Sequence, residues 1–87
     1  MEKKEKNKEE ISILASYGLD NEMLKICESI LMKNELDNVE KEVCQYIQNI
    51  CYLHKDSLEA TSLIAKSELK KRIYNELRRM LGWFDMI

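Results

Sequence analysis

The sequence predicts an all-α protein, a small antiparallel bundle of about four helices with a long C-terminal helix. Proline is absent and glycine occurs only at Gly18 and Gly82, so few of the 87 residues oppose helical structure. Apolar residues recur at three- and four-residue steps in several segments, which is the period of one helix face. Short links between these segments are typical of antiparallel neighbours in a bundle.

The first ten residues read Met-Glu-Lys-Lys-Glu-Lys-Asn-Lys-Glu-Glu. Because this segment has almost nothing apolar to bury, we expect residues 1–10 to form a charged, flexible N-terminal arm. Residues 11–87 then form a single helical domain, which is within the usual size range of one domain.

Two short helices are expected in the first half of the domain. The first covers residues 11–19 with a weak amphipathic pattern, and Gly18 is a stop signal. Asp20 and Asn21 then provide a new N-cap. The second helix follows this cap and ends near Lys33, with an apolar face made of Met23, Leu24, Cys27, Ile30 and Leu31.

A third helix is predicted to begin after Asp37 and to end at about Lys55. Asp37 and Glu40 are three residues apart, as in a capping box, where cap and third helical residue satisfy each other's backbone amides. The apolar face of this helix consists of Val39, Val43, Tyr46, Ile47, Ile50, Cys51 and Leu53.

The last helix is predicted to be one continuous rod from Leu58 to Gly82, about 25 residues long. Asp56 and Ser57 are expected to cap its start, and Gly82 to end it as a left-handed C-cap. Its apolar face comprises Leu58, Ser62, Ala65, Leu69, Ile73, Leu77, Met80 and Phe84. Three short helices cannot easily cover this face, so we expect a homodimer.

Four basic residues are predicted to form a ridge on the polar side of this helix. They are Lys71, Arg72, Arg78 and Arg79, spaced in two pairs seven residues apart. Such a ridge is either a solvated face or a surface that binds anions, on nucleic acid or on an acidic protein.

The chain ends with an apolar tail of four residues, Trp83, Phe84, Met86 and Ile87, interrupted only by Asp85. Because chain ends are usually polar unless they are held in place, this tail is expected either to cover its own core or to dock into a partner. Large apolar side chains of these kinds often anchor protein interfaces.

The charge is unevenly distributed along the chain. The net charge is −2 and the pI is about 5.4. Residues 1–56 hold eight basic and twelve acidic side chains, a net of −4, whereas residues 57–87 hold six and four, a net of +2. The acidic total argues against a general nucleic-acid binder, since phosphate contacts need a concentrated positive field.

Few residues suggest catalysis or metal binding. Cys51 and His54 are three residues apart, so a cysteine–histidine pair on one helix face is conceivable, but no other part of a nucleophilic site is evident. Cys27, Cys44 and Cys51 lack the close pairing with further ligands that zinc sites show. We therefore expect the cysteines to be core residues, and expect no cofactor, no metal and no enzymatic activity.

The location expected for the protein is the cytoplasm. The charged start is rich in glutamate, and no small-residue cleavage site follows residues 11–19, so the pattern does not match a signal peptide. No apolar run approaches the roughly 20 residues that span a bilayer. The thiols should then stay reduced.

The function expected from these observations is binding of another protein, by a non-enzymatic inhibitor, adaptor, immunity or regulatory factor. The size, helix content and hydrophobic C-terminal end are similar to those of small four-helix bacteriocin-immunity proteins, in pattern only. The short, Lys-, Glu-, Ile- and Asn-rich chain suggests a bacterial or mobile-element origin. The alternative is a dimeric nucleic-acid-binding transcriptional or replication regulator that uses the basic ridge.

Overall fold

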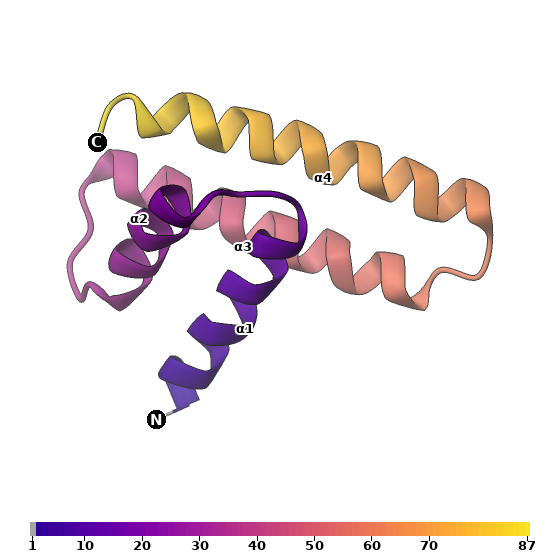
Figure 1. Ribbon diagram of the computed structural model, residues 1–87, viewed down its shortest axis with the longest axis horizontal. Helices are drawn as coiled ribbons and strands as arrows, with labels where there is room; N and C mark the ends of the chain where they lie inside the picture. Colours follow the sequence, from indigo (N-terminus) through magenta and orange to yellow (C-terminus); the bar gives the residue numbers. More distant parts are fainter. Residues whose placement is uncertain (1) are drawn as a thin grey trace.

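The computed structural model describes residues 2–87, with side chains described from Lys6 onward. These residues form four helices and no strands: α1 (Glu2–Ser16), α2 (Asn21–Met32), α3 (Asn38–Glu59) and α4 (Leu63–Phe84) (Figure 1). The structure is 82% helical, which confirms the predicted all-α bundle of about four helices.

Helices α3 and α4 form a long antiparallel hairpin, and the two shorter helices lie along one part of it (Figure 1). α1 and α2 pack against each other and against α3. The end of the hairpin that holds the α3–α4 turn extends past both of them. The hairpin therefore has a covered half and an end without further helices beside it.

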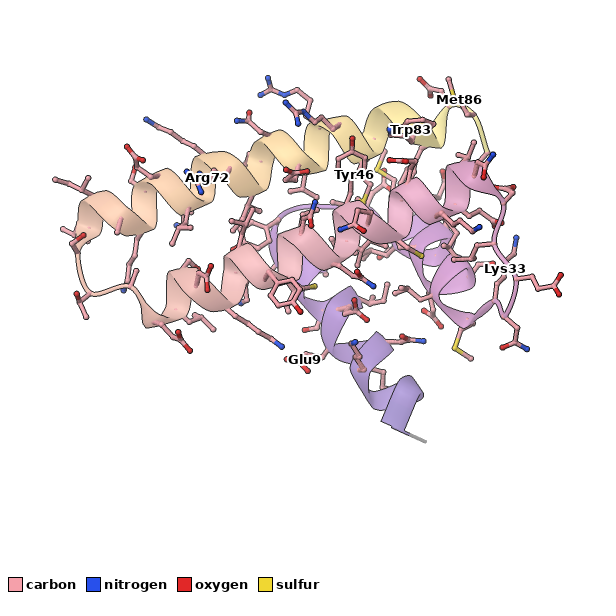
Figure 2. All side chains as sticks on the ribbon, turned by 180° about the vertical axis from the view of Figure 1, so that it is seen from behind. Glu9, Lys33, Tyr46, Arg72, Trp83 and Met86 are labelled. Atoms are coloured by element: carbon pink, nitrogen blue, oxygen red, sulfur yellow. The ribbon has the colours of Figure 1, made fainter. Side chains whose placement is uncertain are left out.

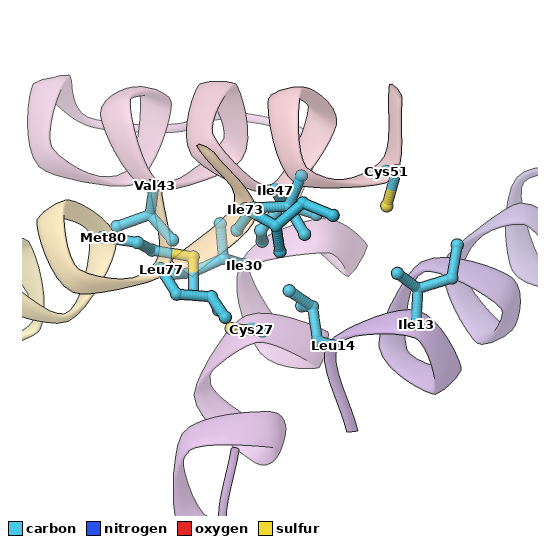
Figure 3. Close-up of a cluster of buried hydrophobic side chains, with 11 residues drawn as sticks. Ile13, Leu14, Cys27, Ile30, Val43, Ile47, Cys51, Ile73, Leu77 and Met80 are labelled. Atoms are coloured by element: carbon cyan, nitrogen blue, oxygen red, sulfur yellow. The ribbon is translucent and has the colours of Figure 1, made fainter. Parts of the chain in front are cut away.

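The core lies where all four helices meet. Buried side chains from each helix gather there, including Leu14 of α1 and Ile30 of α2 (Figure 3). The buried apolar residues are Ile13, Leu14, Cys27, Ile30, Val43, Ile47, Ile50, Cys51, Ile73, Leu77 and Met80. Burial of these side chains is the main stabilising term for a chain of this size.

The predicted caps of the two middle helices are confirmed. Asp20 accepts a hydrogen bond from the backbone amide of Met23 at 2.9 Å. Asp37 accepts one from the amide of Glu40 at 2.8 Å, and Glu40 returns a bond to the amide of Asp37, forming the capping box. Gly18 has φ +96° at the end of α1, a conformation that favours glycine.

The predicted start of the last helix is wrong. Residues 56–59 belong to α3, and the chain turns at residues 60–62 before Ser62 caps α4. The Ser57 hydroxyl donates to the carbonyl of His54 within α3 instead of capping a new helix. The rod expected from Leu58 is therefore split by a turn, and Leu58 is 71% exposed on the other helix.

Gly82 does not end α4, contrary to the prediction. The helix continues to Phe84, and Asp85 is the C-cap residue with φ −64°. Trp83 and Phe84 pack against the core, so the helix gains contacts by continuing past the glycine. Tertiary packing outweighs the modest helix-breaking tendency of one glycine.

Helix α1 runs through the boundary predicted at residue 10. It begins at Glu2, and two polar residues of this charged segment, Asn7 and Glu10, are buried. The Asn7 amide donates to the carbonyl of Leu31 at 3.3 Å. Polar residues thus occupy positions that continue the buried face of α1 toward its N-terminus.

Candidate protein-binding surfaces

A groove of about 320 Å³ lies between α4 and the connection from α1 to α2. Most of its lining is apolar or aromatic, and its one charged member is Arg78. The lining residues are Tyr17, Gly18, Leu19, Met23, Tyr74, Leu77, Arg78 and Leu81. A shallow apolar groove with one cation beside it suits an apolar side chain followed or preceded by a carboxylate.

Aromatic packing holds one wall of this groove in position. The ring of Tyr17 makes edge-to-face contacts with His54, at a centroid distance of 5.6 Å, and with Tyr74, at 5.8 Å. Tyr17 Oη and His54 Nδ1 also share a hydrogen bond of 2.8 Å. Burial raises the pKa of Tyr17, partly opposed by a hydrogen bond to Ser57, so the phenol stays protonated at neutral pH.

The four predicted ridge residues are exposed, but they do not form a single ridge. Consecutive residues on a helix differ by about 100°, which separates Lys71 and Arg78 from Arg72 and Arg79. Arg78 borders the groove described above. Arg72 and Arg79 instead line a separate open hollow of about 460 Å³ between α3 and α4.

The hollow beside Arg72 and Arg79 is polar. Its other lining residues are Asn49, Tyr52, Leu53, Asn75 and Glu76. Among the described side chains, the Oε2 atom of Glu76 is the buried oxygen that has no hydrogen-bond partner. Arg72 and Arg79 lie one helical turn away on either side of Glu76, at spacings that allow ion pairing on a helix.

The four residues of the predicted tail have two different environments. Trp83 and Phe84 belong to α4, are half-buried and pack against the core. Met86 and Ile87 follow the helix and are 68% and 56% exposed. Trp83 and Met86 lie at the C-terminal end of α4, and Arg72 lies well along the helix toward the turn (Figure 2). Met86 and Ile87 are thus the tail residues most exposed to a partner.

The conceivable pair of Cys51 and His54 has features that oppose nucleophilic chemistry. Burial raises the pKa of the Cys51 thiol to about 11, with nearby Glu10 adding to the shift, so very little thiolate forms at neutral pH. His54 is not at a helix end as expected, since α3 continues to Glu59, and its Nδ1 is bonded to Tyr17. Both residues serve packing in this structure.

The burial of two carboxylates was missed by sequence reasoning. Glu40 is buried at the start of α3, where it completes the capping box and pairs with Lys33. Glu10 is buried between α1 and α3, and burial raises its pKa, partly offset by Lys6 and Lys55. The available signal was helical phase: Asn7, Glu10 and Leu14 follow three- and four-residue steps.

The groove itself was also missed, because it depends on residues from three separate segments. Tyr17 and Leu19 lie in the α1–α2 connection, Met23 lies in the first turn of α2, and Tyr74 and Leu81 lie on α4. No periodicity within one segment could show that these residues meet.

Within residues 2–87, none of the helices is both long and apolar enough to cross a bilayer. The cytoplasmic location stays a prediction.

Comparison with models of known protein families, with curated proteins and with solved structures found no match for this chain.

Proposed function

We propose that the protein acts without catalysis, by binding another protein, as a small inhibitor, adaptor, immunity or regulatory factor. The observation that carries this proposal is the groove between α4 and the α1–α2 connection. Tyr74 and Leu81 present apolar surface there at the side of Arg78. A partner segment with an apolar anchor next to an acidic residue fits both features, because the cation can pair with the carboxylate at the edge of the buried contact.

The exposed tail residues extend this surface beyond the end of α4. Met86 and Ile87 follow Leu81 by five and six residues and are mostly exposed. Methionine adapts its shape to apolar partners, which suits a docking surface. Lys71 is seven residues before Arg78, so it adds a second positive charge on the same side of the helix.

The test begins with affinity capture from the source cells and ends with purified components. The bait is compared with the double variant Leu81→Asp and Arg78→Glu, and the protein that only the wild type captures is then purified. In titration calorimetry, we expect the double variant to weaken binding by at least about 100-fold, since it removes an apolar contact and reverses a charge. Removal of Met86 and Ile87 should weaken binding about tenfold.

Two controls distinguish this surface from loss of folding. Circular dichroism should show that the groove and tail variants melt with one cooperative transition, as the wild type does. Ser29→Glu replaces an exposed residue of α2 that lies outside the groove and outside the α3–α4 hairpin, so it should leave binding unchanged. A purified partner that binds all variants equally would refute the proposed surface. Trp83→Ala is less informative, because Trp83 also packs against the core.

A second candidate function is nucleic-acid binding, and the observation in its favour is the polar hollow. Arg72 and Arg79 stand there beside Tyr52 and two asparagines, a set that can contact phosphates and stack on a base. The acidic chain as a whole opposes it. Gel shifts with heparin competition at two salt concentrations test it. Salt-sensitive binding that Arg72→Ala and Arg79→Ala abolish would favour this function over the first.

A further inference from the structure

The end of the α3–α4 hairpin, residues 52–72, contains no buried residue. We name this segment the distal hairpin. The last buried residue of α3 is Cys51 and the first of α4 is Ile73, so the core stops on both helices at the same level. When two helices pack only on each other, each buries one narrow stripe of its surface. Stable helical domains bury more, because further helices pack against such a pair.

The distal hairpin also exposes large apolar side chains next to its turn. Leu58 is at the end of α3, and Leu63 and Ile64 begin α4 with 85% and 78% of their surface exposed. Leu53, Ala65 and Leu69 are half-buried on the facing sides of the same segment. Single exposed leucines are common, but three within seven residues around one turn form a patch of the kind that marks an interaction surface.

The charges of the distal hairpin favour a copy of itself as the partner. Asp56 and Glu59 lie in the last turn of α3, close to the α3–α4 turn, whereas Lys70 and Lys71 lie about two helical turns into α4. When two such hairpins pack antiparallel, the acidic end of each lies beside the basic end of the other. Lys66 also lies at the acidic end, one turn into α4, whereas Arg72 adds a third positive charge at the basic end; Lys55 and Glu68, of opposite sign, lie between the two ends.

A partner of uniform charge fits this surface less well. A strongly acidic protein would meet repulsion at Asp56 and Glu59, and a strongly basic one at Lys70 and Lys71. A two-fold arrangement satisfies both ends at once, because each contact between an acidic and a basic end occurs twice.

We propose that the distal hairpins of two copies pack side by side and antiparallel around a two-fold axis. The α3 and α4 segments of both copies then form a four-helix bundle, in which Leu58, Leu63 and Ile64 become core residues. This interface uses none of the residues that line the groove at Arg78 and shares only Lys71 with the partner-binding surface proposed above, so it does not depend on that function.

The first test measures molar mass by light scattering and sedimentation from about 1 µM to about 1 mM, the range in which interfaces of modest size associate. We expect a monomer–dimer equilibrium for the wild type. The double variant Leu63→Glu and Ile64→Glu should raise the dimer dissociation constant at least about 100-fold, since charges would replace apolar contacts. Glutamate is favourable in the first turn of a helix, so the monomer should stay folded.

The matched control is Met32→Glu. Met32 is also an exposed apolar residue, but it lies at the end of α2, away from the distal hairpin. Its substitution should leave the dissociation constant unchanged. Melting curves of both variants at low concentration establish that the monomer fold is retained.

The second test examines the antiparallel arrangement by charge exchange. Glu59→Lys alone and Lys70→Glu alone each place like charges together at both ends of the dimer, so each should dimerise at least about tenfold more weakly than the wild type. An equimolar mixture of the two variants pairs opposite charges at both ends again. It should form a heterodimer with nearly wild-type affinity.

Three results would overturn the proposal. One is a wild-type protein that stays monomeric through the whole concentration range. Another is a dimer that the Leu63 and Ile64 substitutions leave as strong as before. The third is a mixture of the charge variants that associates no better than either variant alone, which would exclude the antiparallel pairing.

Discussion

The covered half of the α3–α4 hairpin and the distal hairpin are built from the same two helices, yet only the first contains a core. In the covered half, Ile47 and Ile73 are fully buried because α1 and α2 lie against the hairpin there. In the distal hairpin, Leu63 and Ile64 are exposed although they are equally apolar. An apolar pattern thus shows which face of a helix can be buried, and neighbouring helices decide where burial occurs.

The comparison also separates two kinds of function on one molecule. The groove at Arg78 belongs to the covered half, where aromatic contacts of Tyr17 fix its wall. A preformed surface of this kind loses little conformational freedom on binding. The distal hairpin instead has exposed apolar residues that no other helix covers. Association with a second copy would bury them and so would also stabilise the folded state of this region.

The largest expected difference between the two regions concerns core truncation. Ile47→Ala should lower the free energy of unfolding by about 2–5 kcal/mol, because it removes buried methyl groups and leaves a cavity. In dilute solution, Leu63→Ala should change it by less than about 0.5 kcal/mol, as for other exposed positions. Urea unfolding followed by circular dichroism measures both. Equal losses would show that the distal hairpin is as well packed as the core.

Loss of a helix cap should also destabilise the protein more in the covered half than in the distal hairpin, but by a smaller margin than core truncation does. Asp37→Ala removes the cap of α3 at its covered end and should cost about 1–2 kcal/mol of unfolding free energy. Ser62 caps α4 in the distal hairpin, by accepting from the amide of Ala65 at 3.1 Å. Ser62→Ala should cost less than about 0.5 kcal/mol in dilute solution, because the turn it frays holds no buried residue.

Hydrogen exchange checks the cap comparison independently. Amides in the first turn of α4 should exchange faster in Ser62→Ala, while those around Ile47 keep their protection. The comparison fails if Ser62→Ala lowers the global stability as much as Asp37→Ala does.

The smallest expected effect comes from the buried carboxylate of the covered half. Because burial raises the pKa of Glu10, the folded state binds a proton at this carboxylate more tightly than the unfolded chain does. Its contribution to stability is therefore largest at low pH and declines as pH rises above about 4.5. Glu10→Gln removes the ionisable group, so it should be more stable than wild type at pH 7 by about 0.5 kcal/mol.

The matched control for this prediction is Glu28→Gln, which replaces an exposed glutamate of α2. The stability gap expected for Glu10→Gln should be absent from this variant. In thermal melts, the stability gap between Glu10→Gln and wild type should widen as pH rises above about 4.5. A gap that is constant with pH would mean that Glu10 is ionised as easily in the folded state as in the unfolded chain.

Sequence reasoning predicted the element types well and the boundaries unevenly. Caps at Asp20 and Asp37 were correct because their side chains bond to amides only three residues away. The boundary at Asp56 and Ser57 was wrong because good capping residues also occur inside helices, where Ser57 bonds back to His54. The candidate surface was predicted in part: Arg78 and Met86 are exposed, but Trp83 and Phe84 are partly structural.

The sequence by itself determined the helical class, the caps of the middle helices, the turn at Gly18 and the apolar faces of α2 and α3, since each depends on residues a few positions apart. Only the tertiary structure decided which parts of those faces are buried, that Glu10 and Asn7 join the interior, and that Tyr17, Met23 and Leu81 meet around one groove. These outcomes depend on where α1 and α2 lie along the hairpin. That placement is set by contacts between distant segments, which no local pattern contains.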